Sequence, residues 1–190
     1  MQRISFVESA KVQGRTGELL ADVQKAFGTT PNVAKVMANS PAVLESFLTI
    51  SAAMSGAKIG GTLLHQIKLA TSEANTCDYC SSILTHLGQQ GGIAAADLLD
   101  GRKASSADPR TDAALKFASA VLETHGRVGD EDLHDVRKAG FDDAEIVEIV
   151  AGVVTGCFTN FLNNVANTTL DIPKALPLQA CAVSADCGCA

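Results

Sequence analysis

The sequence predicts an all-α protein, folded as a single-domain helical bundle. Apolar residues recur along most of the chain at the three-to-four-residue spacing that is typical of amphipathic helices. Convincing alternating runs of β-branched and aromatic residues, which would indicate strands, are not seen. The chain has 190 residues, of which 46% are hydrophobic. This length suits one domain with a substantial core.

Capping residues, prolines and glycines mark where the expected helices begin and end. We expect helices at 16–27, 32–37, 41–54, 63–74, 77–89, 93–99, 109–124 and 130–138, and a last long one ending near residue 167. Asp142 is a typical N-cap for this last helix. Its apolar residues lie on most sides, which places it at the buried centre of the bundle.

The chain is expected to divide into a folded part and a tail. Residues 1–173 carry the helical patterns and form the all-helical domain. Residues 174–190 contain a proline and many small residues, and three of the cysteines, Cys181, Cys187 and Cys189. Because small side chains offer little surface to bury, we expect these residues to form a flexible tail.

Charge and composition exclude several kinds of partner. The net charge of −6 argues against nucleic acid and against a membrane surface, since both attract basic patches. No continuous apolar run approaches the roughly 20 residues of a membrane span, and the first residues lack the apolar core of a signal peptide. A cytoplasmic location is therefore expected. The six cysteines are then expected to be catalytic, metal-binding or simply buried. Structural disulfides are the less favoured interpretation.

Cys77 and Cys80 form a C-x-x-C pair at the start of an expected helix. Unpaired N–H groups at a helix start stabilise a thiolate, and two cysteines at this spacing can close a disulfide. One sulfur then acts as the nucleophile and the other resolves the intermediate. Two other interpretations stay open at this point: a pair of small buried residues, or half of a zinc site.

The segment 63–88, which contains this pair, resembles the signature helix pair of the carboxymuconolactone decarboxylase and alkylhydroperoxidase D-like family, in its peroxidase-related branch. The segments 130–146, 158–166 and 170–173 are also similar, so the resemblance spans about 41–173. It implies an all-helical subunit that assembles as a homo-trimer or homo-hexamer. It also implies reduction of hydroperoxides, with Cys80 attacking the peroxide and Cys77 resolving.

The sequence departs from the family pattern at two positions. The family's thiol members usually have Glu twelve places before the first cysteine, where this chain has His65. They have His four places after the second cysteine, where this chain has Leu84, and the nearest histidine is His86. We expect His65 to return beside the cysteines and relay protons. His86 is a weaker candidate, because it lies about 120° around an ideal helix from Cys80.

The function expected from these residues is that of a thiol-dependent antioxidant oxidoreductase, a peroxidase that reduces small organic hydroperoxides. Its electrons would come from a protein dithiol donor, without a bound cofactor or metal. One alternative is a protein that binds a soft metal or metalloid through Cys77, Cys80, His65 and the tail thiols. A second alternative is a lactone decarboxylase-like enzyme, against which the cysteine pair counts.

Overall fold

The computed structural model describes residues 1–178, and within this range all regular structure is helical. This confirms the predicted fold class. A short 3-10 helix (Ser9–Lys11) precedes the α-helices. These are α1 (Gly14–Phe27), α2 (Asn32–Met37), α3 (Pro41–Met54), α4 (Gly61–Ala74), α5 (Asp78–Gln90), α6 (Ala95–Arg102), α7 (Pro109–Glu123), α8 (Asp130–Lys138) and α9 (Asp143–Ala166).

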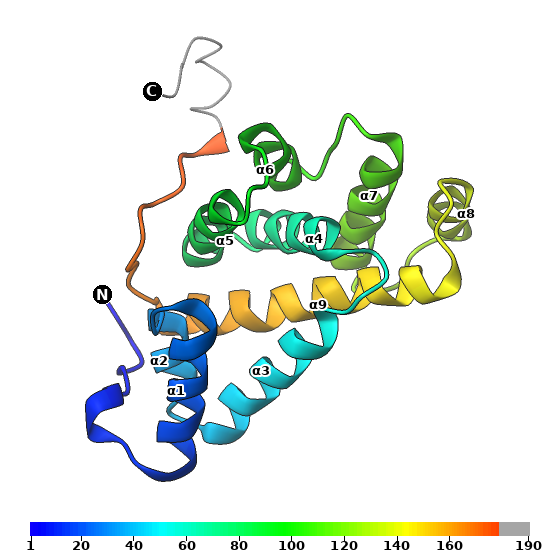
Figure 1. Ribbon diagram of the computed structural model, residues 1–190. Coiled ribbons are helices and arrows are strands. Elements are labelled where there is room, and N and C mark those ends of the chain that lie inside the picture. Colours follow the sequence, from blue (N-terminus) through cyan, green and yellow to red (C-terminus); the bar gives the residue numbers. More distant parts are fainter. Residues whose placement is uncertain (179–190) are drawn as a thin grey trace.

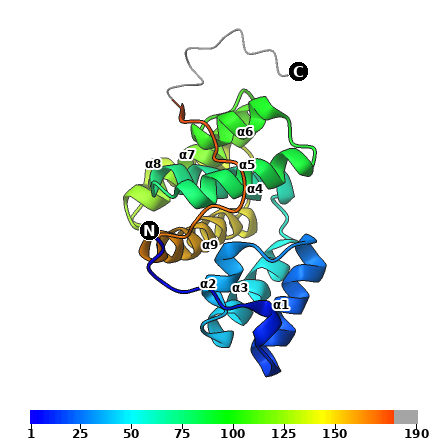
Figure 2. The ribbon, with the colours of Figure 1, turned by 90° about the vertical axis from the view of Figure 1, so that its left-hand side faces the viewer.

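Helix α9 runs through the middle of the molecule. The N-terminal helices α1–α3 lie on one side of it, and α4–α7 lie on the other (Figures 1 and 2). As the sequence predicts, Asp142 caps this helix, because its carboxylate accepts a hydrogen bond from the Glu145 backbone N–H at 3.0 Å. The Glu145 carboxylate accepts one from Asp142 in return, which completes a capping box.

Two glycines let α9 approach α4 closely. A Cβ atom built on Gly156 would lie 2.9 Å from Cγ2 of Thr71, and one on Gly152 would lie 3.0 Å from Cδ1 of Leu64. Any larger residue would push the two helices apart, because packed interiors leave little room for added atoms. This close contact fixes α9 against the helix that leads into the cysteine pair.

Only one face of α9 is buried in the chain. Ile149 and Val153 are in the core, but five apolar side chains are exposed. These are Val147, Val154, Phe158, Phe161 and Val165. The expectation that α9 is buried on most sides is thus correct for the face toward α4 and wrong for the opposite one. By length and composition alone α9 meets the criteria for a membrane span, and its packing against α4, α7 and α3 explains the apolar inner face.

After α9, residues 167–178 run back over the surface of α5. The Lys174 ammonium donates to the Asp78 carboxylate at 2.6 Å, and the Ala175 backbone N–H donates to the Ser82 hydroxyl at 3.0 Å. The chain thus crosses the first turns of α5, as the orange segment in Figure 2 shows. Most of the expected tail, including Cys181, Cys187 and Cys189, lies outside the described residues.

Candidate active site

A tight turn between α4 and α5 presents the cysteine pair. Thr76 in this turn has a φ of 49°, which is uncommon for a residue with a side chain. The chain reverses there, and the Cys77 backbone N–H donates to the Ser72 carbonyl at 2.9 Å. Cys77 is itself the N-cap of α5, since its Sγ accepts a hydrogen bond from the Cys80 backbone N–H at 3.4 Å. Both cysteines are buried free thiols.

The sulfur of Cys80 lies against polar groups of α9. The Asn163 amide donates from Nδ2 to Cys80 Sγ at 3.2 Å. Asn160, one turn earlier on α9, is fully buried, and its Nδ2 donates to the Ser72 hydroxyl at 3.0 Å. Both amides therefore face the helix pair that carries the cysteines: Asn163 contacts the sulfur directly, and Asn160 also ties α4 to α9.

These contacts give the two thiols opposite acidities. A hydrogen bond from the Cys77 thiol, aided by Asn160 and Asn163, lowers the pKa of Cys80 to about 7 although burial opposes the change. The same hydrogen bond to Cys80, together with burial, raises the pKa of Cys77. Cys80 is therefore the sulfur that ionises first, and Cys77 keeps its proton.

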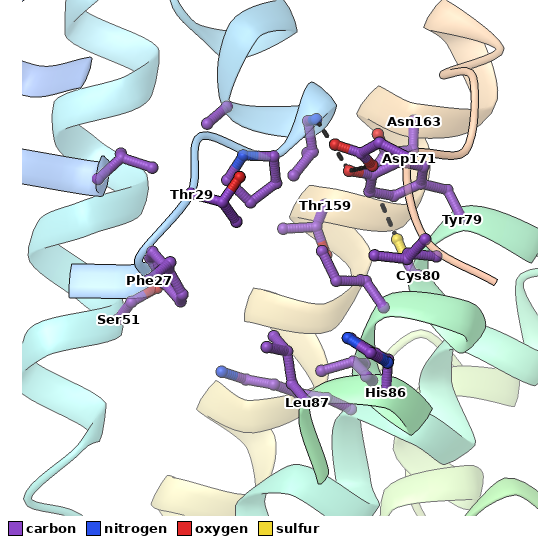
Figure 3. A pocket seen from close by; sticks show the side chains of 18 of the residues that line it. Phe27, Thr29, Ser51, Tyr79, Cys80, His86, Leu87, Thr159, Asn163 and Asp171 are labelled. Atoms are coloured by element: carbon purple, nitrogen blue, oxygen red, sulfur yellow. Dashed lines mark hydrogen bonds between the residues drawn. The ribbon is translucent and has the colours of Figure 1, made fainter. Parts of the chain in front are cut away.

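A cavity of about 530 Å³ reaches Cys80 but not Cys77. Its walls come from α1–α5, α9 and the segment after α9, and they are mostly apolar, with Phe27, Phe47, Ile83 and Leu87 among them. Figure 3 shows Cys80 and Asn163 at one side of it, facing the space bordered by Phe27 and Ser51. A small molecule in this cavity meets the sulfur of Cys80 first.

The end of the cavity near Cys80 is held by Tyr79 and Asp171. The Tyr79 hydroxyl donates to the Asp171 carboxylate at 2.8 Å and accepts from the Val33 backbone N–H at 3.2 Å. The other Asp171 oxygen accepts from the Asn32 backbone N–H at 2.7 Å. Tyr79 is thus occupied in joining α5 to α2 and to the segment after α9 (Figure 3).

Solved structures share this arrangement of helices. One is the alkylhydroperoxidase D core of a peroxidase-related protein from Ralstonia eutropha JMP134, with 24% identity, a TM-score of 0.74, and coverage of 90% of this chain and 92% of that chain. A second is an uncharacterized peroxidase-related protein from Silicibacter sp. TM1040, with 19% identity, a TM-score of 0.75, and coverage of 84% and 86%.

The chain has the alkylhydroperoxidase D fold. The fold implied by the sequence resemblance is therefore confirmed. A cysteine-to-alanine variant of the debrominase Bmp8, in complex with 2,3,4-tribromopyrrole, is also similar, with 17% identity, a TM-score of 0.75, and coverage of 88% of this chain and 91% of that chain. No protein-family model matches the sequence, and no curated protein matches it.

Within this alkylhydroperoxidase D fold, the two candidate histidines occupy different places. The Nε2 atom of His65 lies 2.8 Å from the Leu84 carbonyl oxygen, and His65 does not line the cavity. Burial, and to a smaller extent the charge of Lys68, lower the pKa of His65, so its ring favours the neutral form. His86 does line the cavity, from the second half of α5, and its Nε2 contacts the Gln90 amide at 3.1 Å.

Four polar residues described at this site were not among the sequence candidates: Asn160, Asn163, Asp171 and Lys68. The two asparagines lie three residues apart in a mostly apolar helix, and amides at that spacing face the same side, so they indicate a shared polar target. Lys68 lines the cavity from α4. Nothing in the sequence around Lys68, one turn after His65, predicts that it takes part in the site.

The soft-metal interpretation finds no ready site in the described part of the chain. Among residues 1–178, no three side chains of His, Cys, Asp or Glu gather closely enough to hold a metal ion. Cys77, Cys80 and His65 therefore do not form such a group, and the tail thiols named with them lie outside the described residues.

Proposed function

We propose that this protein is a thiol-dependent peroxidase that reduces organic hydroperoxides, with Cys80 as nucleophile and Cys77 as resolving thiol. The observation that carries the proposal is that the cavity reaches the more acidic of the two sulfurs and not the other. A thiolate is the reactive form of cysteine, and Cys80 is the thiol that forms it beside a space able to hold a substrate.

The reaction has two thiol steps. The Cys80 thiolate attacks the terminal oxygen of R–O–O–H, the O–O bond breaks, and Cys80 becomes a sulfenic acid while RO⁻ leaves as ROH after taking a proton. The Cys77 thiol then loses its proton and attacks the Cys80 sulfur, which closes the disulfide and releases water. A protein dithiol donor returns two electrons and two protons to restore both thiols.

Asn163 and His86 are assigned supporting roles. The Asn163 Nδ2–H holds the thiolate, and its buried Oδ1 has no hydrogen-bond partner among the described residues. That oxygen is placed to accept the hydroperoxide O–H. We assign the proton for the departing alkoxide to His86 rather than His65, because His86 lines the cavity and His65 is held by Leu84.

Stoichiometric oxidation tests the proposal directly. Fully reduced protein should lose two thiols per equivalent of cumene hydroperoxide, and mass spectrometry of alkylated peptides should find the disulfide between Cys77 and Cys80. A Cys157→Ser variant is the control, since Cys157 lies on α9 outside the cavity lining, and it should react as the wild type does. Retention of all thiols, or oxidation confined to other cysteines, would refute the peroxidase.

A second candidate is reductive dehalogenation, favoured by one combination of observations. The cavity beside Cys80 is mostly apolar and includes Phe27 and Phe47, and a debrominase of the same fold binds a brominated pyrrole. The two thiols would supply two electrons to a C–Br bond, yielding a C–H bond, bromide and the Cys77–Cys80 disulfide. Bromide release from a polybrominated pyrrole by reduced protein would support this activity, and its absence would exclude it.

We also propose that copies of this chain cover the exposed face of α9, in a homo-trimer or homo-hexamer. Val147, Val154, Phe158, Phe161 and Val165 are spaced seven, four, three and four residues apart, so they form one stripe along the helix. A contiguous exposed apolar stripe of this kind marks an interaction surface.

Sedimentation velocity at micromolar concentration should therefore find an oligomer. A Phe161→Glu variant should dissociate it, because the new carboxylate would be buried without a partner. A Gln89→Glu variant, which adds the same charge at an exposed site on α5, should sediment as the wild type does. A monomeric wild-type protein would overturn the proposed assembly.

A further inference from the structure

Lys68 is a charged residue of the cavity that the proposed mechanism does not use. It is half-buried in α4 and lines the same cavity as Cys80. Among the described residues its ammonium forms no ion pair and no side-chain hydrogen bond. Burial lowers the pKa of this ammonium, since a cation in apolar surroundings lacks both water and a counter-ion.

The one carboxylate in the cavity lining, Asp171, is occupied elsewhere. Its two oxygens accept hydrogen bonds from the Tyr79 hydroxyl and the Asn32 backbone N–H. Figure 3 shows Asp171 and Tyr79 close to Cys80. The negative charge of the cavity is therefore on the side of the reactive sulfur, which disfavours a substrate anion there. The other titratable groups of the lining, besides Lys68, are Tyr79, Cys80 and His86.

Lys68 and Cys80 lie at different levels of the cavity. The neighbours of Lys68 on α4, Ile67 and Thr71, pack against Gly152 and Gly156 of α9. This places Lys68 near Thr155, which also lines the cavity. Cys80 contacts Asn160 and Asn163 instead, five and eight residues further along α9 than Thr155, or about 8 to 12 Å at the rise of an α-helix. A ligand that reaches both groups must be elongated.

We propose that Lys68 binds an anionic group of the substrate, so that the preferred hydroperoxides are elongated apolar molecules with a carboxylate remote from the peroxide. This inference rests on the proposed function. The carboxylate supplies the counter-ion that Lys68 lacks, through a charge-assisted hydrogen bond. The apolar walls bury the body of the molecule, and the anchored end holds the peroxide at the Cys80 sulfur.

A matched pair of substrates tests the charge alone. Reduced protein is mixed with linoleic acid hydroperoxide or with its methyl ester, and the loss of thiols is followed in a single turnover. The wild type should react with the acid at least about 10-fold faster than with the ester, the effect of one charge-assisted contact. A Lys68→Met variant should lose this preference by slowing with the acid, and should keep the ester rate within about twofold.

Two further measurements separate the inference from the proposed function. A Lys116→Met variant removes the same charge from an exposed site on α7, and should keep the preference for the acid. Decanoate and methyl decanoate are titrated calorimetrically into the reduced wild type and Lys68→Met proteins. Decanoate should bind the wild type at least about 10-fold more tightly than the variant, and the ester should bind both equally.

The outcomes distinguish the two claims. If acid and ester react equally in both proteins, the anion site is refuted and the peroxidase stands. If no hydroperoxide reacts but decanoate binding depends on Lys68, the peroxidase is refuted and the anion site stands. If decanoate binds both proteins equally, Lys68 is not the anchor.

Discussion

Replacing Cys80 with serine is expected to abolish the reaction with hydroperoxides. The Cys80 sulfur is the one that the cavity reaches and whose pKa is lowered, and a serine hydroxyl forms no comparable nucleophile without a base to activate it. Cys77 cannot take over, because it lies outside the cavity lining and its pKa is raised. The loss should be at least about 10³-fold, the order found when a nucleophile that acts as part of a unit is removed.

The matching variant, Cys77→Ser, should behave differently. It keeps the nucleophile and loses the resolving thiol, so one turnover should proceed and stop at the Cys80 sulfenic acid. Trapping with dimedone and mass spectrometry of the labelled peptide locates the oxidised sulfur in each variant. A sulfenic acid on Cys77 in the Cys80→Ser protein would reverse the two assigned roles. If neither variant is oxidised, the proposed peroxidase activity is refuted.

Replacing Asn163 with leucine should shift the pH dependence of the reaction upward. The Asn163 amide donates to the Cys80 sulfur, and a hydrogen bond to a charged group contributes about 1.5–3 kcal/mol. Its loss should raise the pKa of Cys80 by about one to two units. Because the thiolate reacts, the rate rises with pH through this pKa, which is about 7 in the unchanged protein.

At pH 7 the Asn163→Leu protein should therefore react about 5- to 50-fold more slowly through the pKa alone, and this part of the gap should close as the pH rises above both pKa values. The midpoint can be read from the pH profile of peroxide oxidation and, independently, from the ultraviolet absorbance of the thiolate. Asn164→Leu is the control, since the Asn164 amide donates to the Asn75 carbonyl and not to a sulfur. A midpoint that stays in place in Asn163→Leu would mean that this amide does not stabilise the thiolate.

Local signals in the sequence were enough to place the helices. Predicted and observed bounds agree at 32–37, 41–54 and 130–138 and differ by at most three residues elsewhere. Proline, glycine and Asp142 mark helix ends through backbone preferences that act within a few residues. One detail differs at the site: Cys77, expected as the first residue of a helix, is the N-cap of α5.

The roles within the site depend on contacts that no local pattern encodes. The helix start alone favours Cys77 as the more acidic thiol, yet the hydrogen bond from Cys77 and the amides of Asn160 and Asn163 on α9 favour Cys80. His65 was expected beside the cysteines, but α4 and α5 run antiparallel from their tight turn. His65 therefore lies opposite Leu84, about one helical turn beyond Cys80 on α5.

Asn163, which helps to lower the pKa of Cys80, also affects when this thiol becomes reactive during synthesis and folding. The two cysteines lie in one helix hairpin, which can form early because its contacts are local. The Asn163 amide is 83 residues further along, and on the ribosome it is made long after the hairpin has emerged. Until α9 docks, Cys80 lacks this donor and the lining that α9 gives the cavity. A half-made or partly unfolded chain thus has at most the hydrogen bond from Cys77, and the full lowering of the Cys80 pKa requires the docked α9.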